Sequence, residues 1–217
     1  MKLLRTFLLS ALFGFPCLLA AQYNLEEFGV EAGPGLSMLM SGTGNAIGPA
    51  ANANAFFSHY ACGKGYGFHI NAGATAMFPS TADGSTMTDQ LSTSKMQFSF
   101  VSLDVAVLGK LRIHEYHRPR EWAVFLGPRL QVPLLARYSN EVGQGSLAST
   151  TSSVSRILPG IELSMQFRQP IGKKKSWFIH PGAAYFFPRA FNAHINPGPK
   201  PLYFFLNFGY ALWDQRG

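Results

Sequence analysis

Two histidines and a carboxylate are the residues of this chain whose types first suggest chemistry. His59, His69 and Glu31 fall in neighbouring apolar segments, and Ser58 directly precedes one of the histidines. A serine or histidine beside a carboxylate that orients the base is the usual arrangement for covalent acyl transfer and hydrolysis. No spacing motif accompanies these residues, so catalysis is an alternative hypothesis and not the main prediction.

A second polar set is spread over the same apolar segments and contains both signs of charge. Charges that are removed from water need partners. We therefore predict a structural network of ion pairs and hydrogen bonds, and a narrow path for protons or solutes is the competing interpretation. The set comprises Glu31, Asp104, Lys110, Arg129, Arg156, Glu162 and Gln166.

The stretch HEYHRPRE contains the only His-x-x-His spacing that suggests a metal ligand pair. His114 and His117 flank Glu115, but a turn does not align two imidazoles as a helix does, and no third or fourth ligand is in view. The stretch is interpreted as a hydrated basic turn, and neither a metal site nor a cofactor is predicted.

In the segments that must position these residues, bulky apolar residues alternate with small or polar ones at a period of two, which predicts β-strands. In the last one, the even positions from Leu202 to Leu212 are bulky and apolar, whereas Asn207 and Gly209 lie on the other face. That second face is mostly small or polar, as expected of a crowded lumen and not of a solvated exterior. The apolar face is therefore predicted to meet lipid. The same period recurs in 28–40, 68–78, 122–134 and 157–167.

Three less regular segments, 53–62, 95–112 and 177–188, bring the expected number of strands to eight. In 95–112 the apolar phase moves from Phe98 and Phe100 to Val101 and Leu103, which predicts a bulge near Phe100. Long and short connections alternate, as in outer-membrane barrels. The long ones are 41–52, 80–94, 139–153 and 189–200, and the short ones are 63–66, 113–121 and 169–176.

The first residues and the composition agree with export to a membrane. Lys2 and Arg5 precede an apolar run that ends in small residues near Ala21, so 1–21 is predicted to be a cleaved signal peptide and 22–217 one barrel domain. Charged residues make up 13% of the chain, about half the usual share. Nucleic acid is not an expected partner, because the chain is exported and has no recognition motif.

Aromatic and basic residues gather at the short turns. Interfacial tryptophans form girdles at membrane boundaries, so Trp122, Trp177 and Trp213 are predicted to mark one rim, which the basic residues share. Outer-membrane lipid headgroups are the favoured contact of this rim, and an acidic protein is the alternative. The basic set is Lys64, Arg112, Arg118, Arg120, Arg168, Lys173, Lys174 and Lys175.

The signal exit at Ala21–Gln22 is followed by the stretches GVEAGPGLSML, FVSLDVAVLGKLRI and WAVFLGPRLQVPLL. On these residues the whole mature chain resembles the PorT-type outer-membrane proteins of Bacteroidota, which are similar in form to small OmpX-like barrels. The resemblance implies an eight-stranded barrel in the outer membrane, in a group where some members serve secretion or gliding. The aromatic last strand also resembles the signal that barrel-assembly machinery reads during insertion.

The sequence thus predicts an all-β fold, an eight-stranded antiparallel up-and-down transmembrane barrel in the bacterial outer membrane, with both termini periplasmic. A non-enzymatic membrane anchor, or an accessory subunit with protein partners in an envelope or secretion complex, is the expected function. The alternative is a lipid-A-modifying enzyme that uses His59 or His69 with Glu31.

Overall fold

The computed structural model describes the strands and some of their connections. The described residues are 25–40, 45–60, 65–81, 96–113, 121–140, 157–171, 174–188 and 200–214. The predicted signal peptide lies outside them. Within the described ranges, no helix is long and apolar enough to cross a membrane.

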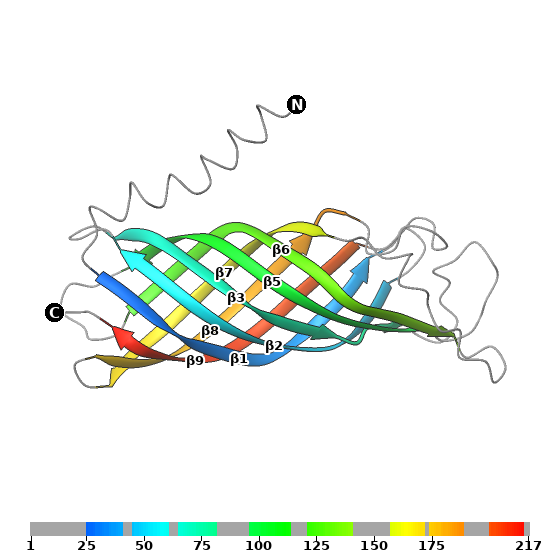
Figure 1. Ribbon diagram of the computed structural model, residues 1–217, viewed down its shortest axis with the longest axis horizontal. Helices are drawn as coiled ribbons and strands as arrows, with labels where there is room; N and C mark the ends of the chain where they lie inside the picture. The colour runs from blue at the N-terminus through cyan, green and yellow to red at the C-terminus, as the bar shows by residue number, and fades with distance from the viewer. Residues whose placement is uncertain are drawn as a thin grey trace, which may run out of the picture.

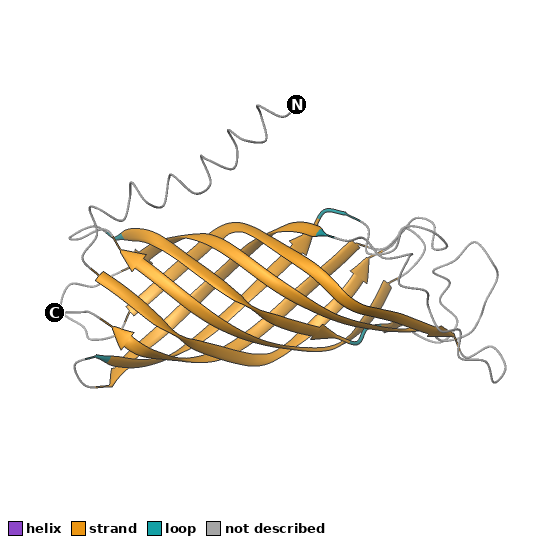
Figure 2. Ribbon diagram, in the orientation of Figure 1, coloured by secondary structure: helices purple, strands orange, loops and turns teal. Residues whose placement is uncertain are grey.

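Eight long antiparallel strands form one closed barrel (Figure 1). The wall of the barrel consists of strands along its whole length (Figure 2). Successive strands pair with one another, and β1 pairs with both β2 and β9, which closes the sheet. The predicted fold class is confirmed. The strands are β1 (Leu25–Met40), β2 (Asn45–Tyr60), β3 (Tyr66–Met77), β5 (Met96–Ile113), β6 (Glu121–Asn140), β7 (Leu158–Ile171), β8 (Lys175–Phe186) and β9 (Lys200–Asp214).

A two-residue strand, β4 (Ser80–Thr81), continues the position of β3 between β2 and β5. The break between β3 and β4 falls at Phe78 and Pro79, and a proline has no N–H to give to a sheet. Its carbonyl still accepts a hydrogen bond from the backbone N–H of Phe98 at 2.8 Å. The barrel wall therefore continues past the proline.

Apart from the start of β5, the two faces of the predicted strand segments have the predicted orientation. On β6, for example, Leu126 and Leu130 are half-exposed, whereas Phe125 and Arg129 are buried in the lumen. Because the outward residues are apolar and many inward residues are polar, the barrel is the reverse of a soluble one.

The first connection differs from the prediction, because β2 begins at Asn45 and not near Ala53. The residues expected to form a long loop after Ser41 instead pair with β1 up to Met40. Small residues such as Ala46 and Ala50 fill the inward positions here, so the apolar contrast between the two faces was too weak to reveal the strand.

The predicted bulge is present but lies on the partner strand. Side chains alternate without interruption on β5, with Phe98 and Phe100 both inside the lumen. The register between β5 and β6 shifts where Val101 faces Leu135 and Ser102 faces Pro133. The change of apolar phase on β5 arises because the lumen itself becomes apolar at this end.

Aromatic rings inside the lumen lie over glycines of neighbouring strands. The ring of Phe178 on β8 occupies the space that a side chain at Gly209 on β9 would fill, and Phe205 does the same over Gly182. Each glycine thus leaves room for a large ring on the lumen side of the wall. This pairing helps a narrow barrel to enclose bulky side chains.

Gly209→Ala is expected to lower the free energy of unfolding by about 1–3 kcal/mol, because the new methyl group displaces the Phe178 ring. Urea unfolding of the barrel in detergent measures the loss. Gly109→Ala is the matched control, since its nearest neighbour would be the Leu126 carbonyl oxygen at 3.5 Å. Equal stability of the two variants would contradict this role of Gly209.

Candidate functional site

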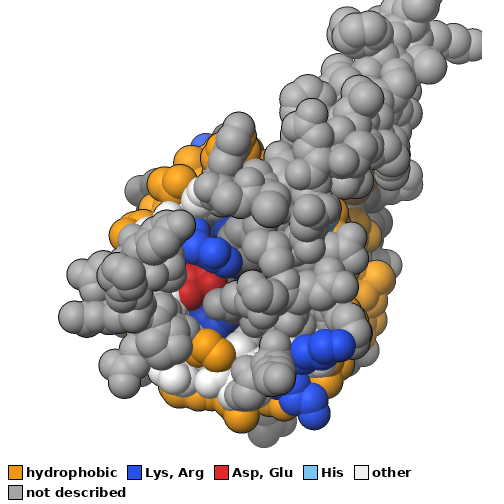
Figure 3. All heavy atoms as spheres, turned by 90° about the vertical axis from the view of Figure 1, so that its left-hand side faces the viewer, with side chains coloured by type: hydrophobic (Ala, Val, Ile, Leu, Met, Phe, Trp, Pro, Cys, Tyr) orange, Lys and Arg blue, Asp and Glu red, His pale blue; other side chains and the backbone are white. Residues whose placement is uncertain are grey.

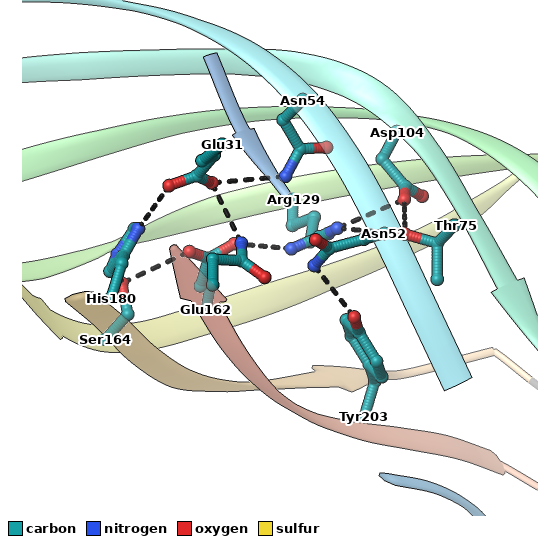
Figure 4. A network of polar contacts seen from close by, with 11 residues as sticks. Glu31, Asn52, Asn54, Thr75, Asp104, Arg129, Glu162, Ser164, His180 and Tyr203 are labelled. Carbon is teal, nitrogen blue, oxygen red and sulfur yellow. Dashed lines mark hydrogen bonds and ion pairs between the residues drawn. The ribbon is translucent and has the colours of Figure 1, made fainter. Parts of the chain in front are cut away.

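The middle of the lumen is organised around Arg129 of β6 (Figure 4). Its guanidinium donates to Glu162 of β7 at 2.8 Å and to Asp104 of β5 at 3.1 Å. Asp104 also accepts a hydrogen bond from Thr75 of β3. All four side chains are buried, so one arginine ties four adjacent strands together from the inside.

A chain of hydrogen bonds continues this cluster to β1. Glu31 contacts His180 Nδ1 at 2.8 Å, His180 Nε2 contacts Ser164 at 2.9 Å, and Ser164 donates to Glu162 at 3.2 Å. The second oxygen of Glu31 accepts from the amide groups of Asn54 at 3.1 Å and Asn207 at 3.0 Å. The network therefore crosses the lumen from β1 to β7 and β8.

A second ionic cluster lies near the end where β1 begins and β9 ends. Glu27 pairs with Arg168 at 2.5 Å and with Lys110 at 3.4 Å, and Glu121 pairs with Arg112 at 3.1 Å. Seen from this end, Figure 3 shows acidic and basic side chains within a rim of hydrophobic ones. We call these five residues the basal cluster.

Aromatic rings separate the ionic groups along the lumen. Lys110 lies 5.4 Å from the ring centre of Phe125, and Arg168 lies 5.3 Å from that of Phe178. Arg129 is 5.8 Å from both Tyr203 and Phe205. These distances permit cation–π attraction, which stabilises charges that are removed from water.

The opposite end of the lumen is apolar. Here the inward side chains of β1, β2, β3, β5 and β9 pack as one buried cluster, and a smaller cluster forms between β7 and β8. The sequence alternation could not show this region, because apolar residues occupy both faces there. Members include Leu39, Met77, Phe98, Phe100, Leu158 and Phe186.

The structure brings most of the predicted lumen set together, in two groups. Asp104, Arg129 and Glu162 meet directly, and Glu31 joins them through His180 and Ser164. Lys110 belongs to the basal cluster, and Gln166 adjoins it, because Gln166 accepts a hydrogen bond from Arg168 at 2.9 Å. Arg156 lies outside the described residues.

Sequence reasoning missed three ionisable members of these networks, which are Glu27, Glu121 and His180, and four neutral ones, which are Asn54, Thr75, Ser164 and Asn207. The three ionisable residues are buried. Glu27 has the same parity as Glu31 on β1, Glu121 has the same parity as Arg129 on β6, and His180 has the opposite parity to the outward Trp177 on β8. Strict use of the two-residue period would therefore have found them.

The residues of the predicted basic rim lie in different environments in the structure. Lys174 and Lys175 are exposed, but Arg168 is fully buried in the lumen, and Arg112 is paired with Glu121. The placement of Arg168 on the rim was wrong, because it shares the inward parity of Gln166. Lys64, Arg118, Arg120 and Lys173 lie outside the described residues.

Two of the three predicted girdle tryptophans are described with their side chains. Trp122 and Trp177 face outward, and the ring of Phe167 lies between them, at 4.8 and 6.3 Å. They form an outer aromatic band at the end of the barrel that carries the basal cluster. The side chain of Trp213 lies outside the described residues.

The two histidines of the enzyme hypothesis do not converge. His69 contacts Ser58 at 2.6 Å inside the lumen. His59 instead lies on the other face of the wall, stacked on Phe57 and beside the tilted ring of Phe68. Glu31 instead contacts His180. In the described ranges no three His, Cys, Asp or Glu side chains are grouped so as to hold a metal ion.

An apolar exterior around a filled polar lumen defines the class of the chain as a β-barrel of the membrane-spanning type. No family model and no curated protein matches the sequence, so the resemblance to PorT-type proteins stays a prediction.

Solved structures with some likeness to the chain are small outer-membrane barrels. Neisserial surface protein A is 13% identical, with 84% of this chain and 95% of that chain covered and a TM-score of 0.45. Ail of Yersinia pestis, in complex with the heparin analogue sucrose octasulfate, is 15% identical over 86% and 99%, with a TM-score of 0.46. OprG of Pseudomonas aeruginosa is 10% identical over 88% and 98%, with a TM-score of 0.43.

Replacing the central arginine is expected to destabilise the barrel. Arg129→Met leaves Asp104 and Glu162 as buried unpaired carboxylates, which costs about 3–5 kcal/mol of unfolding free energy. Urea unfolding measures the loss, and adding Asp104→Asn and Glu162→Gln should restore part of it. Arg112→Met, at a side chain that is 18% exposed, is the control with a smaller loss. Wild-type stability of Arg129→Met would contradict the account.

Proposed function

We propose that this protein is an integral outer-membrane barrel with a closed lumen, which serves as a membrane anchor or accessory subunit of an envelope complex. The observation that carries the proposal is the combination of an apolar outer surface with a lumen filled by its own side chains. The predicted signal peptide and the outward tryptophans support the location. Both termini would then be periplasmic.

The lumen contents argue against a general pore. Arg129 and its partners cross the middle, the basal cluster fills one end, and apolar side chains pack at the other. An eight-stranded barrel has an interior just wide enough for side chains. Function therefore belongs to the outer wall and the two ends of the barrel.

The same burial supports a non-enzymatic role. Ser164, His180 and Glu31 are ordered like a nucleophile, base and orienting carboxylate. However, their exposed fractions are 4%, 0% and 3%, so a lipid substrate has no access to the serine. The structural use of these groups, as links between β1, β7 and β8, accounts for their geometry.

Vesicles that contain the refolded protein are expected to resist swelling in an isosmotic arabinose solution, because the sugar has no path through the filled lumen. Light scattering after mixing measures the swelling. Empty vesicles and vesicles with a general porin give the lower and upper limits. Porin-like swelling would refute the closed lumen.

An accessory subunit must present part of its outer wall to a partner, and the two sides of this barrel differ. Midway along the wall, outward alanines of three adjacent strands lie side by side, because Ala32 of β1, Ala53 of β2 and Ala74 of β3 are register neighbours. Outward positions of β5, β6 and β7 carry Leu, Val and Ile, among them Leu130. Small side chains let a second backbone approach closely in a membrane.

A photo-crosslinking amino acid at position 53 is therefore expected to join the protein in cells to one defined partner, whereas the same group at position 130 is not. Immunoblotting and mass spectrometry of the adduct measure this. Adduct at neither position, or the same adducts at both, would contradict an accessory role through this wall.

A further inference from the structure

The backbone pairing of the barrel wall is interrupted at two prolines in the middle of their strands. The register between β7 and β8 omits Pro181 and its neighbour His180. The register between β1 and β9 omits Pro34 and its neighbour Gly33. Because a proline has no N–H to donate to the next strand, each seam lacks a backbone hydrogen bond at this place.

The two gaps lie on either side of one hairpin, at the same level. β8 and β9 pair with each other without interruption, 176–185 with 202–211. In this pairing Pro181 faces Leu206, and the register of β1 and β9 on both sides of its gap places Leu206 opposite Pro34 as well. The β8–β9 hairpin is therefore a continuous unit whose backbone attachment to β7 and to β1 is weakest at mid-length.

Side chains inside the lumen bridge the same two gaps (Figure 4). His180 of β8 contacts Ser164 of β7 at 2.9 Å, across the first gap. Asn207 of β9 donates to Glu31 of β1 at 3.0 Å, across the second. The other carboxylate oxygen of Glu31 contacts His180 at 2.8 Å, and His180 and Asn207 are register partners. One carboxylate thus holds both strands of the hairpin where the backbone does not.

A third gap, at Gly127 and Pro128 between β5 and β6, is bridged by an ion pair. Arg129, next to this proline, pairs with Asp104 of β5 at 3.1 Å. Hydrogen bonds between charged groups are about twice as strong as those between neutral ones. At the gap between β7 and β8 the bridging group is instead the uncharged hydroxyl of Ser164, so this seam is held less firmly than the one between β5 and β6.

We propose that the β8–β9 hairpin is a movable part of the barrel wall, and that the contacts Glu31–His180–Ser164 are the latch that holds it closed. Both seams stay paired on either side of their gaps, so the motion is a parting of the wall at mid-length and not a detachment. The ladder within the hairpin stays intact, so the parting mainly breaks side-chain contacts. This inference goes beyond the proposed function, because a closed lumen needs no movable wall.

Two serines give a matched test, because each contacts a histidine of the adjacent strand inside the lumen. Ser164 bridges the interrupted seam, whereas Ser58 contacts His69 at 2.6 Å across β2 and β3, whose register is continuous there. Amide hydrogen exchange measured by NMR in detergent micelles reports local opening. Ser164→Ala is expected to accelerate exchange on both β8 and β9 near their gaps by about two- to tenfold, which corresponds to one lost hydrogen bond. Ser58→Ala should leave exchange on β2 and β3 unchanged.

Pro181→Ala returns an N–H to β8 and separates a latch from an ordinary packing contact. We expect slower exchange along the hairpin in this variant, and little effect of Ser164→Ala when the two changes are combined. Equal effects of the two serine variants, acceleration confined to β8, or an effect of Ser164→Ala that does not depend on the proline would overturn the proposal. If Ser164→Ala does not refold, unchanged exchange in Pro181→Ala alone would overturn it.

Discussion

The ion pairs of Arg129 with Asp104 and Glu162 are the interaction on which the rest of the lumen depends. A barrel in lipid cannot turn its polar side chains outward, so the polar residues of eight strands must satisfy one another in a narrow space. Arg129 does this for β5 and β7, and its neighbours Thr75 and Ser164 extend the contacts to β3 and β8. Removing the arginine would leave charges that no other described residue is placed to neutralise.

The aromatic packing and the ion pairs inside the lumen depend on each other. Phe178 and Phe205 lie against glycines of the wall and beside the cations Arg168 and Arg129. The rings exclude water from the ion pairs, which strengthens the pairs, and the glycines make room for the rings. The lumen is consequently a packed interior like the core of a soluble protein, although many of its residues are polar.

Much of the fold could be predicted from the sequence, because a period of two assigns each side chain to a face. The period was not informative where the two faces do not differ in polarity. The start of β2 was missed because small residues such as Ala46 and Ala50 lie there, and the inward position of Phe98 and Phe100 was missed because that end of the lumen is apolar. Parity alone would have placed Arg168 in the lumen. It could not have paired Glu31 with His180, which are 149 positions apart, because that contact depends on closure of the barrel and on the height of each residue along its axis.

The central claim, a filled lumen inside a lipid-facing wall, is tested most directly by spin labels placed one at a time along β6 in lipid vesicles. The account predicts strong collision with membrane-dissolved oxygen at the even positions, such as 126 and 130. At the odd positions, such as 125 and 131, it predicts little collision with either oxygen or a water-soluble nickel complex. Ready access of the nickel complex to the odd positions would contradict a filled lumen, and its access to the even positions would contradict a wall that faces lipid.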